Sequence, residues 1–439
     1  MSTSKLSSSG WGRSIRSQST EFNENLDVLQ NLIKIFHSKR GAIPVGLHRS
    51  YGDSALNSGG LQISTAKFKS ATLDSQSGVI QVGAGVSIRE LENIALQKGF
   101  FPAIVPGTGY VTIGGAIAAD IHGKSHHKTG SFSSIVKSMS VLYSDSIIRE
   151  LHPDGPTSSH FWATVAGLGL TGIIVEAKLQ LSPVLGNHFV VREKRSRDLE
   201  QLLTDLKSAD AEYDHTVAWI DISGKYSGRG VVGMGNFAME FDRKFELKTG
   251  QIDLPITPTR SLITPKTVEL FNALWYRKPL KNGLVGINAF THPLDAIGSW
   301  NRVYGREGFL QYQFAIPDGE EDFLFHVLSR LKAIRAVSFL GILKRFGKAS
   351  NAALSFPAPG WTLALDFSTS IPKLEQTLNE FDAELVSRKG RVYLVKDSRL
   401  RAEFLPKMYP RLEEWKVIRQ EMDPQKLWNS DQGRRLELC

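Results

Sequence analysis

Residues 106–124 read PGTGYVTIGGAIAADIHGK and form the most glycine-punctuated stretch of the chain. Glycine has no Cβ atom, so the backbone can adopt turns with positive φ and aim several N–H groups at one point. The small residues Gly115–Asp120 predict a helix tight enough to pack on a flat ring or a diphosphate. We therefore interpret Gly107, Gly114 and Gly115 as ligand contacts, with close helix–strand packing as the alternative.

The residues before this stretch have the pattern of strands, turns and helices in alternation. Apolar spacing predicts an opening helix over Asn23–Ser38, a strand over Ile43–Leu47 and another strand over Gly78–Val82. The last of these ends at a glycine turn, and an amphipathic helix containing Ile88 and Leu91 follows it. This order of elements is typical of a ligand cradle.

From about Gly186 the pattern changes to longer polar helices that alternate with aromatic strands. The predicted helices span 198–208, 321–333 and 371–389, and the predicted strands span 309–314 and 361–367. Lys248–Lys266 contains three prolines and is predicted to be a long loop or lid. A further helix is predicted over Ala402–Arg419. The chain is therefore predicted to be α+β, with a first domain to about residue 185 and a second after it.

The composition excludes several classes of protein. Of 439 residues, 41% are hydrophobic and 22% are charged, which is typical of a globular protein and not of a disordered or collagenous one. The one cysteine is the last residue, Cys439, so no internal disulfide or buried cysteine nucleophile is predicted. No apolar run reaches about 18 residues, so we predict no transmembrane helix. A net charge of +9 suits an anionic ligand, a nucleic acid or an acidic membrane surface equally well.

The first twenty residues are rich in serine and contain no acidic residue. They lack the apolar centre of a secretory signal, so we predict a ragged N-terminus rather than a targeting segment. The lack of an export signal favours a cytoplasmic location, and the periplasmic face of a membrane is left open.

Two segments, Gly167–Gly172 and Gly228–Gly233, match the pattern G-x-G-x-x-G. A dinucleotide site of the Rossmann type needs a strand before this pattern, a helix after it and an acidic residue further on. The first match runs into a strand-like segment, and the second shows no helical period. We interpret both as chance matches.

Three histidines, His122, His126 and His127, lie close together in sequence. Glycine and serine between them argue against a continuous helix, and no carboxylate stands at the spacing of a zinc-binding helix. We predict no metal site here. An imidazole or Lys124 is better interpreted as a hydrogen-bond donor or a local cation near an anionic ligand.

Two aromatic and basic runs, Leu274–Lys278 and Tyr393–Arg399, have the composition of strands with one solvent-exposed face. The second run clusters hydrogen-bond donors. A lysine beside an apolar strand, such as Lys396, can have a lowered pKa and act as a base.

Several of these motifs resemble the FAD-binding domain of the vanillyl-alcohol-oxidase superfamily, also called the PCMH type. The resemblance rests on GLHRSYGD at 46–53, PGT at 106–108, TIGGAIAADIHGK at 112–124 and FWAT at 161–164. More narrowly, the chain resembles the family of flavin subunits of decaprenylphosphoryl-β-D-ribose 2′-epimerases almost from end to end. The supporting motifs are GWGR at 10–13, LWYRK at 274–278, HPLD at 292–295, WNR at 300–302, GFLQYQF at 308–314, KDSR at 396–399 and RRLEL at 434–438.

This resemblance implies an α+β flavoprotein of two domains. An FAD-binding domain over 1–185 would be completed by 393–439, and a substrate-binding domain with a large antiparallel sheet would span 186–392. Tyr393 and Lys396 would then meet the flavin beside the N-terminal glycine loops.

The implied activity is FAD-dependent oxidation of the ribose 2-hydroxyl of a polyprenylphosphoryl-β-D-ribose to a ketone. This is the first half of an epimerisation to the arabinose form, for the synthesis of cell-envelope glycan. A separate NAD(P)H-dependent short-chain reductase would complete it as partner. The lipid phosphate suits the positive net charge and a peripheral membrane contact, and no nucleic acid is implied. A soluble sugar or aldonolactone oxidase that uses O2 is the alternative.

The family pattern also implies roles for single residues. The catalytic residues are Lys396, Tyr51 and His122. Those that bind FAD are Gly46, Arg49, Ser50, Tyr51, Gly52, Asp53, Gly107, Thr112, Gly114, Gly115, Ala119, His122, Ile174 and Tyr393. Those that bind substrate are Gln311, Gln313, Lys344, Arg302 and Lys396. Arg49 stands where many superfamily members carry the histidine that attaches FAD covalently, so the resemblance implies noncovalent FAD.

Overall fold

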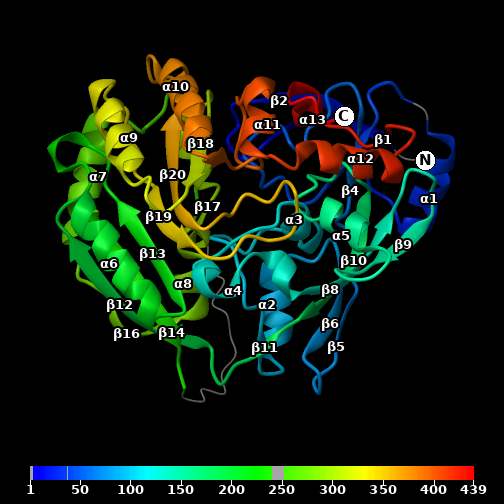
Figure 1. Ribbon diagram of the computed structural model, residues 1–439, viewed down its shortest axis with the longest axis horizontal. Helices are drawn as coiled ribbons and strands as arrows, with labels where there is room; N and C mark the ends of the chain where they lie inside the picture. The colour runs from blue at the N-terminus through cyan, green and yellow to red at the C-terminus, as the bar shows by residue number, and fades with distance from the viewer. Residues whose placement is uncertain (1–2, 37, 240–251) are drawn as a thin grey trace.

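The computed structural model describes residues 3–36, 38–239 and 252–439, and its strands form two lobes that lie side by side (Figure 1). The first lobe contains strands β1–β11 and the C-terminal helices, and the second lobe contains strands β12–β21. The blue N-terminal and red C-terminal segments meet in the first lobe (Figure 1). The predicted α+β class is confirmed.

The first lobe is built on two main sheets, with strand orders β1-β2-β4-β3 and β5-β6-β10-β8-β9. Its strands are β1 (Thr3–Ser9), β2 (Arg16–Phe22), β3 (Ala42–Val45), β4 (Leu61–Ser64), β5 (Ala71–Leu73), β6 (Val79–Gly83), β7 (Phe100–Phe101), β8 (Val136–Leu142), β9 (Ile148–Leu151), β10 (Ile173–Gln180) and β11 (Ser182–Pro183). Its helices before β12 are α1 (Leu26–Ile35), α2 (Ile88–Leu96), α3 (Ile113–Ala118), α4 (His126–Thr129) and α5 (Ser158–Thr164). The helices predicted near the N-terminus, after the glycine turn and within the glycine-rich stretch are therefore confirmed.

The second lobe is built on one antiparallel sheet with the order β16-β12-β14-β13-β19-β20-β18-β21. Its strands are β12 (His188–Ser196), β13 (His215–Ile220), β14 (Gly230–Phe237), β16 (Asn282–Gly286), β18 (Phe309–Ile316), β19 (Gly341–Phe346), β20 (Gly360–Ser368) and β21 (Arg391–Val392); β15 (Ile252–Asp253) pairs with β17 (Ile297–Gly298) outside this sheet. Its helices are α6 (Leu199–Glu212), α7 (Pro265–Arg277), α8 (Ile287–Thr291), α9 (Asp322–Ala333) and α10 (Leu374–Ser387).

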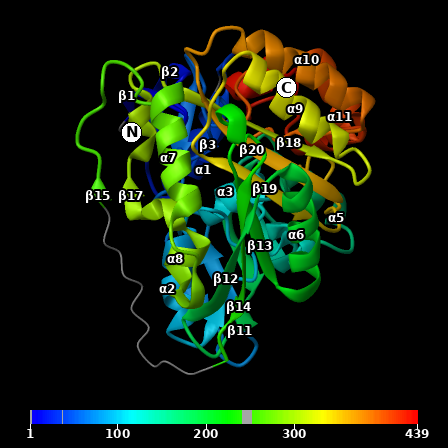
Figure 2. The same cartoon turned by 90° about the vertical axis from the view of Figure 1, so that its left-hand side faces the viewer.

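The two faces of this sheet are used differently. Side chains alternate between the faces of a strand. Along β18, the rings of Tyr312 and Phe314 contact Phe381 of α10 and Phe323 of α9. Helices α6, α9 and α10 lie on that side of the sheet, and α7 and α8 lie on the other (Figure 2). The face toward α7 and α8 is the one that turns to the first lobe.

The C-terminal segment leaves the second sheet at β21 and packs on the first lobe as α11 (Leu405–Met408), α12 (Leu412–Met422) and α13 (Asp431–Arg435). The buried Trp415 of α12 donates a hydrogen bond of 2.9 Å from Nε1 to the carbonyl of Ala163 in α5. Arg435 of α13 forms ion pairs with Asp53 and Asp397, each at 2.8 Å. The boundaries at residues 185 and 393 stay predictions.

Three expectations, about the N-terminus and two predicted strands, were wrong. The N-terminus is not ragged, because Thr3–Ser9 pairs with β2 along its whole length. The run Leu274–Lys278 is not a strand, because the capping box at Thr264 and a proline at the next position begin helix α7, which continues to Arg277. Tyr393–Arg399 is a turn beyond β21.

The helix predicted over 402–419 is broken between α11 and α12. Of the predicted loop 248–266, residues 248–251 lie outside the described residues, and its last two residues belong to α7. Among the helices that the structure describes, none has the length and apolar content needed to cross a bilayer.

Replacement of Arg435 by methionine is expected to lower the free energy of unfolding by about 3 kcal/mol, because it leaves the buried Asp53 and Asp397 without their cation. The exposed pair Arg401–Glu403 supplies a matched control, and Arg401→Met is expected to change stability by less than about 0.5 kcal/mol. Urea unfolding followed by tryptophan fluorescence measures both. Equal effects of the two substitutions would contradict a structural role for the Arg435 cluster.

Candidate active site

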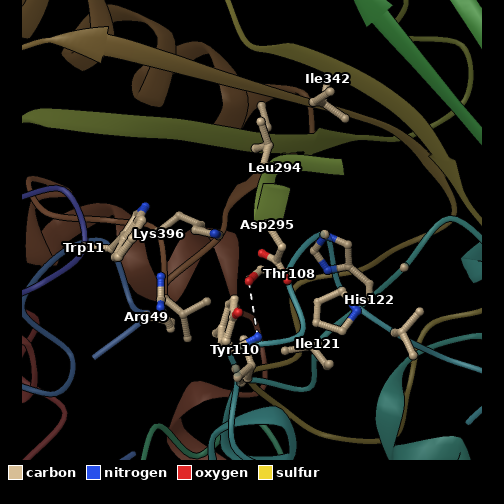
Figure 3. Close-up of a pocket in the computed structure, with 18 of the residues that line it drawn as sticks. Trp11, Arg49, Thr108, Tyr110, Ile121, His122, Leu294, Asp295, Ile342 and Lys396 are labelled. Carbon is tan, nitrogen blue, oxygen red and sulfur yellow. Dashed lines mark hydrogen bonds between the residues drawn. The ribbon is translucent and has the colours of Figure 1, made fainter. Parts of the chain in front are cut away.

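A cavity of about 690 Å³ lies between the two lobes. The loops after β3, before α3 and before β10 form its wall in the first lobe, and the inner face of the large sheet forms its wall in the second. Figure 3 shows Lys396 and Arg49 on one side of this cavity and His122 on the other. The predicted residues that line it are Gly46, Arg49, Ser50, Tyr51, Gly107, Thr112, Gly114, Gly115, Ala119, His122, Ile174, Gln311, Gln313, Lys344, Tyr393 and Lys396. Their roles in binding and catalysis stay predictions.

Three predicted site residues do not line the cavity. Gly52 is a packing position, because a Cβ atom there would lie 1.9 Å from the carbonyl oxygen of Asp397. Asp53 accepts hydrogen bonds from Nε and one terminal nitrogen, Nη2, of Arg435, at 2.9 and 2.8 Å. Arg302 donates a hydrogen bond to the carbonyl of Leu254. These residues belong to the frame around the cavity, and their predicted contacts with FAD or substrate stay predictions.

The loop after β3 lines the cavity and contains backbone N–H groups that lack an acceptor among the described residues. His48 adopts a positive φ of 51°, and residues 47–50 donate no backbone hydrogen bond to any acceptor in the described parts of the chain. Successive N–H groups with no internal acceptor form a concave site for an anion. Gly46 is required at its start, because a Cβ atom would lie 2.3 Å from Thr112 Oγ1.

Thr112 in turn caps helix α3, and its Oγ1 accepts a hydrogen bond of 3.2 Å from the N–H of Gly115. Gly114 packs against the turn after β6, since a Cβ atom there would lie 3.0 Å from Ala84 Cβ. At Gly107, by contrast, a Cβ atom would meet nothing within 4 Å and would project into open space. Within residues 106–124, Gly114 thus allows close packing against the turn, and Gly107 leaves open space beside the cavity wall.

A second glycine turn contributes to the same wall. Leu168, Gly169 and Gly172 line the cavity, and all three have positive φ angles. The absence of a Rossmann site at Gly167–Gly172 stands, because strand β10 and not a helix follows. The match to the dinucleotide pattern therefore lacks its structural context, and the segment instead forms a turn in the cavity wall.

Lys396 and Tyr51 meet where the C-terminal segment returns to the first lobe. The Tyr51 N–H donates a hydrogen bond of 3.1 Å to the carbonyl of Val395, and Lys396 Nζ lies 3.7 Å from the centre of the Tyr51 ring. Burial lowers the pKa of Lys396, the nearby carboxylate of Asp366 acts against this, and Lys344 adds to it. Burial raises the pKa of Tyr51 well above its ordinary value, so the phenol is neutral.

A hydrogen-bonded chain fixes the protonation of His122. Thr362 Oγ1 donates to the carbonyl of Phe314 at 2.9 Å, so this oxygen accepts the 3.2 Å hydrogen bond from Gln313 Nε2. The same amide nitrogen lies 3.2 Å from His122 Nε2, which must therefore accept. Burial lowers the pKa of His122 well below its ordinary value. The imidazole is consequently neutral with its proton on Nδ1, an atom that has no partner among the described residues.

Three lysines, Lys124, Lys344 and Lys396, line the cavity. Burial lowers the pKa of Lys344 to about 8 and that of Lys124 to about 7. Within the described residues, none of the three forms an ion pair with a carboxylate. The cavity therefore carries a positive potential that favours an anionic ligand.

Two carboxylate contacts join the lobes at the edge of the cavity. Asp295 of the second lobe accepts hydrogen bonds from Arg89 at 2.7 Å and from the N–H of Gly109 at 2.8 Å. Glu92 of α2 lies 2.8 Å from His292 Nε2, and both side chains are fully buried. These residues of the HPLD motif fix the second lobe on the first, a role that the sequence did not reveal.

Comparison with known proteins identifies the family. A model described as FAD binding domain matches residues 22–152. The chain is 38% identical over 413 residues to a decaprenylphosphoryl-β-D-ribose oxidase of Mycolicibacterium smegmatis, which covers 91% of this chain and 90% of that protein. The chain belongs to the decaprenylphosphoryl-β-D-ribose oxidase family.

Two further relatives are more distant. An uncharacterised protein of Streptomyces coelicolor is 32% identical over 371 residues, which is 80% of this chain and all of that protein. A D-lactate dehydrogenase of Archaeoglobus fulgidus is 26% identical over 171 residues, which is 36% of this chain and 37% of that protein. The match to this dehydrogenase therefore covers only part of each chain.

The family assignment establishes a two-domain FAD-dependent oxidoreductase of the vanillyl-alcohol-oxidase type. The cavity fits this cofactor on independent grounds. The free N–H groups of residues 47–50 suit a diphosphate, and the open wall at Gly107 leaves room beside it.

Substitution of Gly46 by valine is expected to reduce the flavin content of the purified protein. The new side chain would displace Thr112, and overpacking of this kind costs about 1–3 kcal/mol, here at the cap of the helix beside the cofactor site. The ratio of flavin to protein absorbance measures the effect. Gly286→Val is the control, because a Cβ atom there meets nothing within 4 Å. Full flavin content in Gly46→Val, with normal far-ultraviolet circular dichroism, would contradict this role of Gly46.

Proposed function

We propose that the protein oxidises the ribose 2-hydroxyl of a polyprenylphosphoryl-β-D-ribose to the 2-keto form, as the first half of an epimerisation to the arabinose form. The printed name of the Mycolicibacterium relative, which shares 38% identity across nine tenths of both chains, supports this substrate. The observation that carries the chemistry is Lys396, which is half-buried on the cavity wall with its Nζ 3.7 Å from the centre of the Tyr51 ring.

Oxidation of a secondary alcohol removes a hydride from carbon and a proton from oxygen. Bound FAD supplies the hydride acceptor. The amine of Lys396 supplies the base, because its lowered pKa leaves a neutral fraction at physiological pH that an ordinary lysine lacks. Asp366 then stabilises the ammonium formed, because its carboxylate raises the pKa of Lys396. Gln311 holds Asp366 through a 2.6 Å hydrogen bond from Nε2.

Donors on the cavity wall have a complementary task. The Nδ1–H of His122 is available to an oxygen of the sugar or the cofactor, because Gln313 occupies Nε2. Protonated Lys344 and Lys124 attract the phosphate of the substrate. Residues of both lobes thereby hold the sugar in one orientation relative to Lys396, which is the condition for efficient proton transfer.

The proposal includes noncovalent binding of FAD. Arg49, which replaces the attachment histidine of many superfamily members, has its guanidinium 4.1 Å from the Trp11 ring centre and 5.1 Å from that of Tyr110. Arginine forms no flavin linkage of the histidyl type, and the pKa of the adjacent His48 is lowered by burial. Denaturation followed by ultrafiltration is expected to release all the flavin into the filtrate. Flavin retained with the protein would contradict this part of the proposal.

The proposal also includes a partner and a location. The 2-keto product is reduced by a separate NAD(P)H-dependent short-chain reductase, and the reaction takes place on the cytoplasmic side.

The decisive test mixes the purified protein, in the absence of oxygen, with a polyprenylphosphoryl ribose that has a short chain, and follows the loss of oxidised-flavin absorbance. Addition of the reductase and NADH is expected to give the arabinose form. Turnover of free sugars with hydrogen peroxide release, and none with the lipid phosphate, would favour the alternative sugar oxidase.

Replacement of Lys396 by methionine is expected to slow flavin reduction by about 10²–10⁴-fold while FAD stays bound, because the substitution removes the base and keeps the length of the side chain. In the wild type the rate is expected to rise with pH through a midpoint well below the ordinary lysine value of 10.5, since the base must be neutral and burial lowers its pKa. Stopped-flow reduction across pH measures both. A methionine variant with the wild-type rate and pH profile would exclude Lys396 as the base.

A further inference from the structure

Helix α7 has an unusual distribution of apolar residues. Inside the fold it buries only Val268 and Asn272. Facing solvent it carries Leu270 and Leu274, each 64% exposed, and Phe271 and Trp275, which are 42% and 38% exposed. These four residues, called here the α7 face, recur at helical spacing and therefore form one continuous strip. The helix is thus amphipathic with its apolar side turned outward.

A polar network and not an apolar core fixes the inner side of this helix. Asn272 donates hydrogen bonds to Asp221 at 2.8 Å and to the carbonyl of Ser338 at 3.3 Å. Asp221 in turn pairs with the buried Arg229 at 2.9 Å. Because this network anchors α7 to the second sheet, the exposed side chains are not needed to hold the helix in place. We therefore interpret these exposed apolar side chains as a contact surface for something outside the protein.

The α7 face is continuous with the cavity. Phe271 and Trp275 line the cavity and are also exposed, so the cavity reaches the surface beside them. Their rings stack at 5.9 Å, and Phe271 makes an edge contact with the cavity residue Phe339. A ligand with a long apolar tail could therefore leave the cavity along this strip without crossing a polar surface. Figure 2 shows α7 on the side of the sheet opposite α6, α9 and α10.

Basic residues surround the strip. Lys266 and Arg277 lie at the two ends of α7, on the same side of the helix as Leu270, and Arg260 and Lys281 lie in the flanking loops. All four are exposed, and none pairs with a carboxylate in the described residues. Glu269 is the single acidic residue of the helix. An apolar strip bordered by free cations complements a bilayer with anionic headgroups.

We propose that the α7 face docks the protein on an anionic lipid bilayer, with Leu270 and Leu274 inserted below the headgroups and the cavity opening toward the lipid. This inference rests on the proposed function in one respect, since a substrate carried by a polyprenyl chain is delivered from the bilayer. The docking surface itself is argued from α7 and its charges alone. The sugar of the substrate can then enter the cavity while its polyprenyl tail stays in the membrane.

The test measures sedimentation of the FAD-loaded protein with vesicles of phosphatidylcholine alone and of phosphatidylcholine with phosphatidylglycerol. Binding to the anionic vesicles is expected, with only part of it lost at high salt because apolar insertion persists. The variant Leu270→Glu/Leu274→Glu is expected to bind the anionic vesicles at least about tenfold more weakly than the wild type. The matched control Ile147→Glu/Val417→Glu, which changes two exposed residues elsewhere, is expected to bind as the wild type does.

The outcomes separate docking from catalysis, because Leu270 and Leu274 do not line the cavity. Both double variants are expected to keep their flavin and to reduce it at the wild-type rate with a short-chain substrate in solution. Failure of the wild type to bind anionic vesicles, or equal loss in both variants, would overturn the docking surface while leaving the oxidase reaction intact. A wild-type dimer in light scattering that the α7 variant converts to a monomer, without vesicle binding, would show instead that a second copy covers this face.

Discussion

The contact between the loop after β3 and the segment that returns from β21 governs the geometry of the whole site. Tyr51 donates its N–H to Val395, and Gly52 lies so close to Asp397 that no larger residue fits. These two backbone contacts bring Tyr51 and Lys396 together although 345 positions separate them. The Arg435 cluster locks the same junction from outside the cavity. Without this junction, the base would have no fixed position relative to the glycine loops.

The second requirement is the alternation of side chains along the large sheet. One face must be apolar to pack α6, α9 and α10, and the other must present Gln311, Gln313 and Lys344 to the cavity. A shift of one residue in the pairing of β18 with β20 would exchange these faces. The fully buried Phe314 therefore contributes to the site as well as to the core, because its burial fixes the register that places Gln313 beside His122.

The sequence supports prediction of local elements better than prediction of how they meet. Helix α3 and the glycines around it follow from composition, because only small residues allow the close approach to Thr112 and Ala84. The aromatic residues of Leu274–Lys278 favour a strand, whereas the capping box at Thr264 and the proline after it begin helix α7. The turn before β10 matches the dinucleotide pattern without the helix that this pattern needs, and its place in the cavity wall depends only on the turn.

Three residues of the predicted site lie outside the cavity wall for one shared reason. Asp53 and Gly52 belong to a motif that lines the cavity, yet their own side-chain positions point into the junction with the C-terminal segment. Arg302 likewise belongs to a motif of the second lobe, WNR at 300–302, but contacts a neighbouring loop. A motif therefore locates a segment, whereas the direction of each side chain depends on partners far away in sequence. His292 and Asp295 illustrate the converse, since only the fold pairs them with Glu92 and Arg89.

The lysines of the cavity show why the positive charge of this chain is informative only once it is located. A net charge of +9 is compatible with many anionic partners. Lys344 and Lys124, however, pay a desolvation cost that lowers their pKa values, and no carboxylate in the described residues pairs with either of them. Without a ligand, these ammonium groups would have a lower free energy in water than in the cavity wall. An anionic ligand in the cavity would restore their protons and offset this cost, so binding and protonation of these lysines are coupled.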